Sequence, residues 1–250
     1  MIVLATVLLV VAFGGAAYWL LMAPFGPTAR TYPHRAPAGD KVVALTFDDG
    51  PNEPYTSEIL DILEDRGVKA TFFHVGQCVE RHPDVVRRVI AAGHVVGNHS
   101  LSHRFGTYLR PGAYEREVER TQQILTNVTG HTPALARTPW LWRHPGLLRM
   151  LRRRDLHPVA GEFGHALEVF QPSGVRMGRR AVAKTRPGSI LIFHDGFDGH
   201  GGNRGETVRA VRETVDGLLR RGYKFVTVDK LLGVSAYQGL AGSAERKYSS

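Results

Sequence analysis

Two adjacent carboxylates, Asp48 and Asp49, stand in the run Thr-Phe-Asp-Asp-Gly-Pro. Neighbouring side chains of a strand point to opposite faces, so two adjacent acids share a site only where the strand has ended. Gly50 and Pro51 force a turn directly afterwards, which lets both acids lean into one loop. Two close carboxylates repel each other unless a cation or a proton lies between them. The run would therefore suit a metal, but taken alone it fits an ordinary Asp–Gly turn better.

Three further clusters carry groups suited to chemistry. His99 and His103 are four residues apart, a spacing that would place two imidazoles on one face of a helical turn. Imidazole suits zinc, and also copper, nickel and iron. His194 ends an apolar run and is followed by an acid and a glycine. Arg137, three residues before Trp140, could orient a carboxylate bidentately, and the indole could form the wall of a sugar site. Alone, the histidine pair could arise by chance in a chain with 12 histidines, and His194 could stand in a surface turn.

Alternating strands and helices are expected to position these clusters. Apolar runs predict seven strands, at 42–47, 70–75, 94–97, 134–137, 157–160, 189–193 and 223–228. Helical patterns separate them, at 55–66, 84–92, 114–127, 145–153, 175–184 and 207–221. This order predicts parallel units, in a barrel or in a doubly wound sheet. In a barrel, catalytic groups gather where strands end, and all four clusters follow a predicted strand. We therefore expect the four clusters to form one site.

A catalytic metal arrangement follows from combining the clusters. Asp49, His99 and His103 would supply one carboxylate and two imidazoles, and would leave positions open for water, as in catalytic zinc sites. Zinc lowers the pKa of bound water toward about 7. Asp48 would then take the proton of the water, and His194 would protonate the departing amine.

The order Thr-Phe-Asp-Asp-Gly-Pro, His-Ser-x-x-His, Arg-x-Pro-Trp and Leu-x-x-His-Asp resembles the NodB-type polysaccharide deacetylases, carbohydrate esterase family four. The similarity covers roughly residues 41–232, and its first motif is the most specific. It implies a distorted (β/α) barrel of about seven or eight strands. It also implies hydrolysis of the N-acetyl groups of chitin-like or peptidoglycan sugars. A wall-binding module without turnover, or an enzyme for O-acetyl esters or small cyclic amides, are the alternatives.

The same resemblance implies a role for each motif residue. It makes Asp48 the base, Asp49, His99 and His103 the metal ligands, Arg137 the residue that orients the base, Trp140 a backbone donor to the oxyanion, His194 the acid and Leu191 a wall of the acetyl pocket. The expected metal is zinc, with cobalt, nickel or manganese as alternatives.

The chain departs from the family pattern in two places. Leu141 stands where the third motif usually has glycine. The fourth motif, normally an Asp-x-x-Asp-Trp run that supports the acid histidine, is not recognisable. Glu162 or Glu168 could replace its acid, and Phe163 or Phe170 its tryptophan. These departures concern the substrate cleft and the tuning of His194 rather than the metal ligands.

The chain has 250 residues, enough for one large α/β domain or two small ones. It contains a single cysteine, so an intrachain disulfide is impossible. Its net charge is +9. A positive surface suits anionic partners such as phospholipid head groups or acidic wall polymers. Basic residues are not regularly interleaved with aromatic ones, so we expect no nucleic-acid partner. We expect a monomer that acts on an N-acetylated polysaccharide.

The segment from Ile2 to Met22 contains no charged residue and is long enough for a membrane-spanning helix. A cleaved signal peptide or a buried core helix are the alternatives. The first basic residues follow this segment, so the positive-inside rule alone would place the domain in the cytoplasm. A wall substrate requires the opposite orientation. The predicted divisions are a membrane anchor or signal at 1–24, a linker at 25–40, the catalytic domain at 41–234 and a flexible tail at 235–250.

Overall fold

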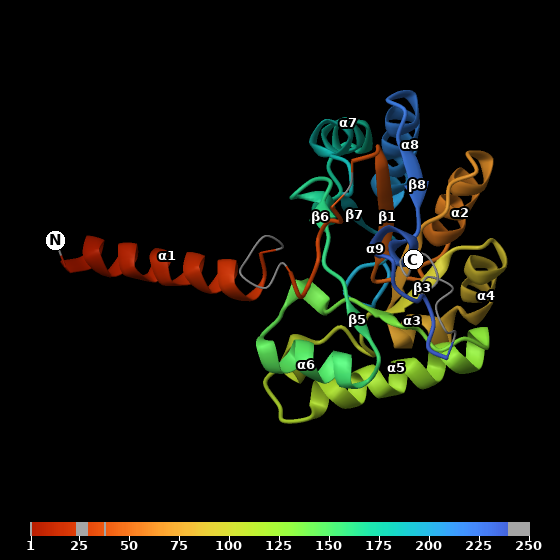
Figure 1. Cartoon of the computed structure of the whole chain (residues 1–250). Helices are drawn as coiled ribbons and strands as arrows, with labels where there is room; N and C mark the ends of the chain where they lie inside the picture. The colour runs from red at the N-terminus through yellow and green to blue at the C-terminus, as the bar shows by residue number, and fades with distance from the viewer. Residues whose placement is uncertain (1, 24–29, 38, 240–250) are drawn as a thin grey trace, which may run out of the picture.

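Strand β1 (Val42–Asp48) lies at the centre of the sheet in this computed structural model, which describes residues 2–23, 30–37 and 39–239. Its partners are parallel: β2 (Thr71–His74) and β7 (Ile190–His194) on its two sides, and the short β8 (Lys224–Val226) beside its first half. The other strands are β3 (Val95–Asn98), β4 (Leu135–Ala136), β5 (His157–Pro158) and β6 (Glu162–Phe163). The order β5-β4-β3-β2-β1-β7-β6 gives a curved, parallel half-barrel (Figure 1).

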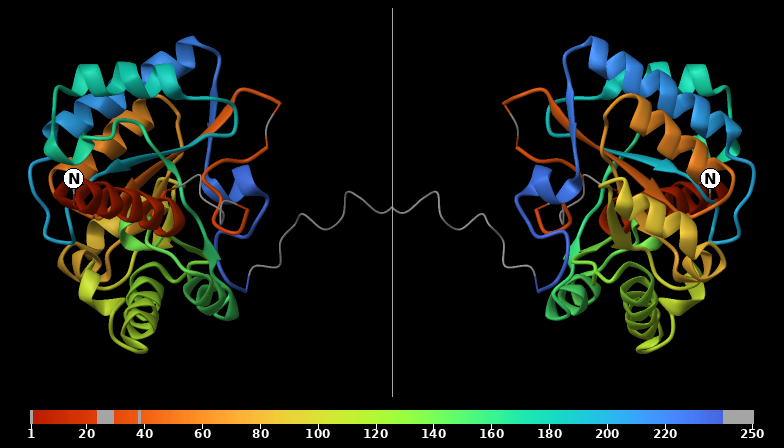
Figure 2. Two further views of the ribbon diagram at one scale, coloured as in Figure 1. Left: turned by 90° about the vertical axis from the view of Figure 1, so that its left-hand side faces the viewer. Right: turned by 90° about the vertical axis from the view of Figure 1, so that its right-hand side faces the viewer.

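Helices surround the sheet on its outer side (Figure 2). They are α2 (Tyr55–Asp65), α3 (Gly76–Arg81), α4 (Pro83–Ala91), α5 (Ala113–Thr129), α6 (Pro145–Arg153), α7 (Gly174–Lys184) and α8 (Gly205–Arg220). Helix α9 (Val228–Leu232) instead packs on the inner side, where Val228 shares a cluster with Ala44 of β1. The largest core cluster fills the space between strands and helices, and it takes Val43, Leu45 and Phe47 from β1. Because side chains alternate along a strand, Thr46 and Asp48 face the other way. The period of the strand thus delivers a carboxylate to the inner face at the strand end.

The predicted parallel order of strands and helices is confirmed. Each predicted strand and helix overlaps an observed one, with ends that differ by at most two residues. The structure adds β6, α3 and α9, which the sequence did not predict. Two residues of β6 and five or six of α3 and α9 are too few to show a hydrophobic period.

The predicted membrane segment forms helix α1 (Ile2–Leu21), which projects from the domain in Figure 1. Large apolar side chains of α1 are exposed, with Phe13 at 78%. Within residues 2–23, 30–37 and 39–239, however, no helix is both long enough and apolar enough to cross a membrane. The transmembrane prediction is therefore not supported.

Parts of the predicted linker and tail contact the domain. Tyr32 is buried, and the backbone N–H of Ala36 donates to Gly188 O over 2.9 Å. Near the other end, Ala134 N–H donates to Ala236 O over 2.8 Å. Residue 1, linker residues 24–29 and 38, and tail residues 240–250 lie outside the described residues.

Candidate active site

The loops after β1 and β7 meet at the two predicted acids. Asp195 N–H donates to Asp48 O over 3.2 Å, which joins the ends of the two strands. Two glycines make this approach possible. A Cβ at Gly50 would overlap the Asp195 carboxylate, and a Cβ at Gly196 would overlap the backbone of Asp49. The glycines that follow the acids in the sequence are thus required by close packing of two loops.

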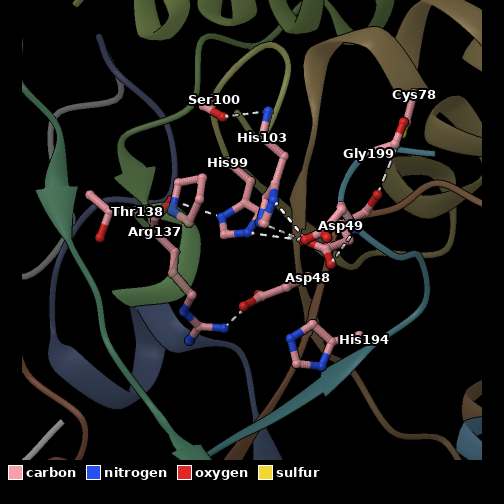
Figure 3. A network of polar contacts seen from close by, with 12 residues as sticks. Asp48, Asp49, Cys78, His99, Ser100, His103, Arg137, Thr138, His194 and Gly199 are labelled. Atoms are coloured by element: carbon pink, nitrogen blue, oxygen red, sulfur yellow. Dashed lines mark hydrogen bonds and ion pairs between the residues drawn. The ribbon is translucent and has the colours of Figure 1, made fainter. Parts of the chain in front are cut away.

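Asp49, His99 and His103 form a buried group whose donor atoms lie within 4.8 Å of one another (Figure 3). Asp49 Oδ1 is 3.2 Å from His99 Nε2 and 3.1 Å from His103 Nε2. This oxygen is buried without a hydrogen bond, although buried polar atoms normally have a partner. An anionic oxygen between two imidazole nitrogens fits a divalent cation with nitrogen and oxygen ligands.

Neighbouring groups fix both imidazoles. His99 Nδ1 lies 2.8 Å from Arg137 O, so its N–H donates to that carbonyl and Nε2 keeps its lone pair for a metal. His103 Nδ1 lies 3.1 Å from Asp198 Oδ1, which favours the same tautomer. Outer partners of this kind are typical of histidines that bind metals.

The two histidines lie on a loop rather than on the helical turn that their spacing suggested. Ser100 and His103 have left-handed φ values of 67° and 54°. Local side chains hold this shape, because Ser100 N–H donates to Asn98 Oδ1 and His103 N–H donates to Ser100 Oγ. Competition of these side chains with backbone hydrogen bonds explains why no helix forms.

Arg137 is fully buried, and its guanidinium donates four hydrogen bonds. One guanidinium nitrogen, NH1, donates to Asp48 Oδ1 over 2.7 Å and to Thr46 Oγ1 over 2.8 Å. Nε and NH2 donate to the carbonyls of Val159 and Ala160. The predicted bidentate contact with a carboxylate is therefore wrong, since Nε and NH2 of the guanidinium are directed to the carbonyls of the segment that follows β5. The contact still fixes the Asp48 carboxylate beside Asp49, His99 and His103, which are called the metal group below.

His194 is paired with one of the two acids that could replace the fourth motif. Glu168 Oε2 lies 2.6 Å from His194 Nδ1, and the other oxygen of Glu168 accepts a hydrogen bond from Thr207 Oγ1. Glu162 instead contacts Arg35 and accepts from Ser189 Oγ. Glu168 thus occupies the place of the missing acid.

An aromatic ring covers the same histidine. The Phe163 ring lies nearly parallel to the His194 imidazole, at 6.1 Å and 10°. Phe170, the other candidate for the missing tryptophan, is 79% exposed. Phe163 therefore takes that place.

The pKa of His194 reflects two opposing effects. Burial lowers it, but the carboxylates of Glu168, Asp49 and Asp48 outweigh burial and raise the pKa to about 9. The pKa of Glu168 is lowered, because its pairing with His194 outweighs the upward effect of burial. The pair is thus a carboxylate and an imidazolium near neutral pH. A cation on the metal group would oppose the rise in the pKa of His194.

A cavity of about 220 Å³ brings these groups together. Its lining includes the metal group, Asp48 and His194, together with Trp140, Leu141 and Phe163. The Trp140 indole also contacts the ring of His103, at 4.4 Å between centroids. The cavity thus combines a cation site, a fixed carboxylate, a charged imidazole and apolar walls.

Comparison with known proteins decides the family. The polysaccharide deacetylase family model matches residues 35–157. A chitooligosaccharide deacetylase from Rhizobium leguminosarum bv. trifolii is 35% identical over 199 residues, which are 75% of this chain and 90% of that protein. The chain belongs to the polysaccharide deacetylase family.

Other members of the polysaccharide deacetylase family agree with this placement. A peptidoglycan-N-acetylglucosamine deacetylase from Bacillus cereus is 32% identical over 207 residues, covering 78% of this chain and 72% of that protein. The solved structure of the Bc1960 peptidoglycan N-acetylglucosamine deacetylase superposes with a TM-score of 0.77 at 27% identity, over 86% of this chain and 100% of that one. The family 4 carbohydrate esterase from Streptomyces lividans gives a TM-score of 0.66 at 28% identity, over 76% and 93%.

Leu191, a predicted site residue of this polysaccharide deacetylase, lies in the core of the domain. Leu191 packs with Phe193 in the main core and is not among the residues that line the cavity. Side-chain alternation along β7 places Ile192 on the same face as His194, and Ile192 packs with Leu141. Of these three residues only Leu141 lines the cavity, and Ile192 lies behind it in the same apolar cluster.

Sequence reasoning missed Asp198 and did not recognise Leu141 as a residue of the cavity. Asp198 follows His194 by four residues within a glycine-containing loop, and an acid there could have been noted as a partner for a metal-binding histidine. Leu141 was noticed only as a departure from glycine. No sequence signal places its side chain in the cavity.

Proposed function

We propose that the protein is a metal-dependent amide hydrolase that removes N-acetyl groups from N-acetylglucosamine units of a glycan. The observation that carries this proposal is the meeting of three kinds of group in one cavity. These are the metal group, the carboxylate of Asp48 held by Arg137, and the imidazole of His194 held by Glu168. Membership of the polysaccharide deacetylase family favours an acetyl amide as the bond that is cleaved.

Asp49, His99 and His103 would hold the cation, for which we propose zinc, with cobalt, nickel or manganese as alternatives. A divalent cation there supplies Lewis acidity toward water and toward the acetyl carbonyl. Asp48 takes the proton of the attacking water, and the hydrogen bond that it accepts from Arg137 holds its carboxylate in place. The backbone N–H of Trp140 donates to the carbonyl oxygen as negative charge develops there.

His194 completes the reaction by donating its proton to the sugar nitrogen as the C–N bond breaks. The products are acetate and a free amino sugar. Glu168 supports this step, since its negative charge keeps His194 protonated until the leaving group needs the proton.

The proposed substrate class is cell-wall peptidoglycan or a chitin-like glycan. The relatives named above include a peptidoglycan-N-acetylglucosamine deacetylase and a chitooligosaccharide deacetylase. The test is acetate release from purified peptidoglycan and from chitin oligomers under identical conditions. Release from either polymer supports the proposal, and the ratio of the two rates identifies the preferred glycan. Release of acetate only from O-acetylated sugars would replace amide hydrolysis by ester hydrolysis.

We also propose that the catalytic domain, residues 41–234, works outside the cytoplasm as a monomer and that α1 attaches it to a membrane surface. The uncharged sequence of α1 and its exposed apolar side chains support attachment. Deleting residues 2–22 should then move the protein from the membrane fraction to the soluble fraction. Protease added to intact cells should digest an outward-facing domain. Complete protection of the domain would contradict a wall substrate.

A further inference from the structure

The turn that follows Arg137 has an unusual backbone. Trp140 has φ 55° and ψ 15°, and Leu141 has φ 55°, so two successive residues with side chains are left-handed. Such residues each cost on the order of 1–2 kcal/mol and persist only where the surroundings hold them. Both side chains line the cavity of the candidate site, so the shape of this turn sets part of that cavity.

Tyr32 holds the start of the turn. Its hydroxyl accepts a hydrogen bond from Thr138 N–H over 3.1 Å and lies 2.7 Å from Thr138 Oγ1. The side chain is 1% exposed, and its ring packs in the same apolar cluster as Leu141. Burial raises the pKa of Tyr32, which keeps its hydroxyl neutral. One side chain therefore hydrogen-bonds the first residue of the turn and packs in the same apolar cluster as its second left-handed residue.

Arg143 ties the end of the turn to the same N-terminal segment. Its backbone N–H donates to Leu21 O over 2.9 Å, and its buried guanidinium donates to Ala23 O. The guanidinium also lies over the Tyr32 ring, 5.6 Å from the centroid. The N-terminal segment thus clamps the turn at both ends, and its three contact residues precede the family match, which begins at residue 35.

We propose that Tyr32 is a positioning residue for catalysis, which acts through Thr138 and Leu141 on the turn that carries Trp140. The proposal rests on the deacetylase function above. Without the Tyr32 hydroxyl, Thr138 N–H loses its acceptor and the turn relaxes from its left-handed shape. The Trp140 N–H and the apolar wall then move, whereas Asp49, His99 and His103, in the loops after β1 and β3, stay in place.

The experiment compares Tyr32→Phe with wild type in the full chain, on chitin oligomers. We expect kcat to fall by about 10- to 100-fold, the effect of a misplaced group of roughly 1 Å, with KM changed by less than about twofold. Metal content and circular dichroism should match the wild type. Tyr237→Phe is the control, because the Tyr237 hydroxyl also accepts from a backbone N–H, that of Val96 at 3.2 Å, away from the turn. Its kcat should stay within about twofold of wild type.

Equal kcat in Tyr32→Phe and wild type would overturn the positioning role, as would equal losses in Tyr32→Phe and Tyr237→Phe. Wild-type protein without activity would instead reject the deacetylase function. If Tyr32→Phe does not fold, the same measurements on Arg143→Lys test the proposal. It should keep its metal and lose kcat with an unchanged KM, and wild-type kcat in that variant would reject the clamp.

Discussion

Glu168 reaches His194 at 2.6 Å from a segment that shows no recognisable family motif. The carboxylate is buried and also accepts from Thr207, so it is held in one orientation. A glutamate on the short helical turn η3 (Glu168–Phe170) thus performs the contact for which the family motif supplies an acid. His194, for which we propose the role of general acid, therefore has a fixed, negatively charged partner.

Glu168→Gln should shift the pH dependence of kcat. A general acid must be protonated, so activity falls as pH rises through the pKa of His194, which its carboxylate neighbours raise. Removing the charge of Glu168 lowers that pKa, so the alkaline limb should move to lower pH. The loss at the optimum should be smaller than the about 10²–10⁴-fold that loss of a general acid costs.

Glu162→Gln is the matched control for this pH profile. Glu162 is a neighbouring glutamate whose carboxylate contacts Arg35 and Ser189. Its alkaline limb should coincide with that of wild type. An unmoved limb in Glu168→Gln would contradict the role of the pair.

Substitutions of Asp48 and Asp49 should affect catalysis and metal binding differently. Asp48→Asn should lower kcat by about 10²–10⁴-fold while the protein keeps its metal, because Asp48 hydrogen-bonds Arg137 and stands outside the ligand group. Asp49→Asn should lose metal and activity together. Metal content measured by mass spectrometry after gel filtration checks both. The opposite pattern in the two variants would exchange their roles.

His99→Ala and His103→Ala should each reduce metal content to a small fraction of the protein. Each variant removes one of three ligands and leaves the Asp49 carboxylate with one imidazole. His157→Ala is the control, since His157 is exposed at β5. Full metal content in both ligand variants would show that the cation binds elsewhere.

Arg137→Lys should lower the free energy of unfolding by about 2–5 kcal/mol, measured with urea. A lysine cannot serve Asp48, Thr46 and the carbonyls of Val159 and Ala160 together, and each buried group left without a partner costs about 1–3 kcal/mol. Arg66→Lys, at a partly exposed pair with Asp216, should cost under about 1 kcal/mol. Equal costs in the two variants would contradict the structural account of Arg137.

The order of strands and helices could be predicted from the sequence, because buried strands and amphipathic helices have clear hydrophobic periods. The meeting of the four polar clusters at one edge of the sheet could also be predicted, because parallel strands end on the same side. Contacts made by segments without a period could not be predicted in this way. Glu168 was one of two candidates until η3 placed it beside His194, and the role of Tyr32 depends on a contact across 106 residues. The predicted position of Leu191 failed for a different reason. Neighbouring side chains of a strand point to opposite faces, so an assignment that is off by one residue selects the wrong face.

The most direct test of amide hydrolysis measures free amino groups and acetate together, on N-acetylated glycan treated with metal-loaded protein. The account predicts equal amounts of both products, loss of both after chelation, recovery when zinc is restored, and neither product with Asp48→Asn. Acetate without new amino groups, or equal product from Asp48→Asn, would contradict it.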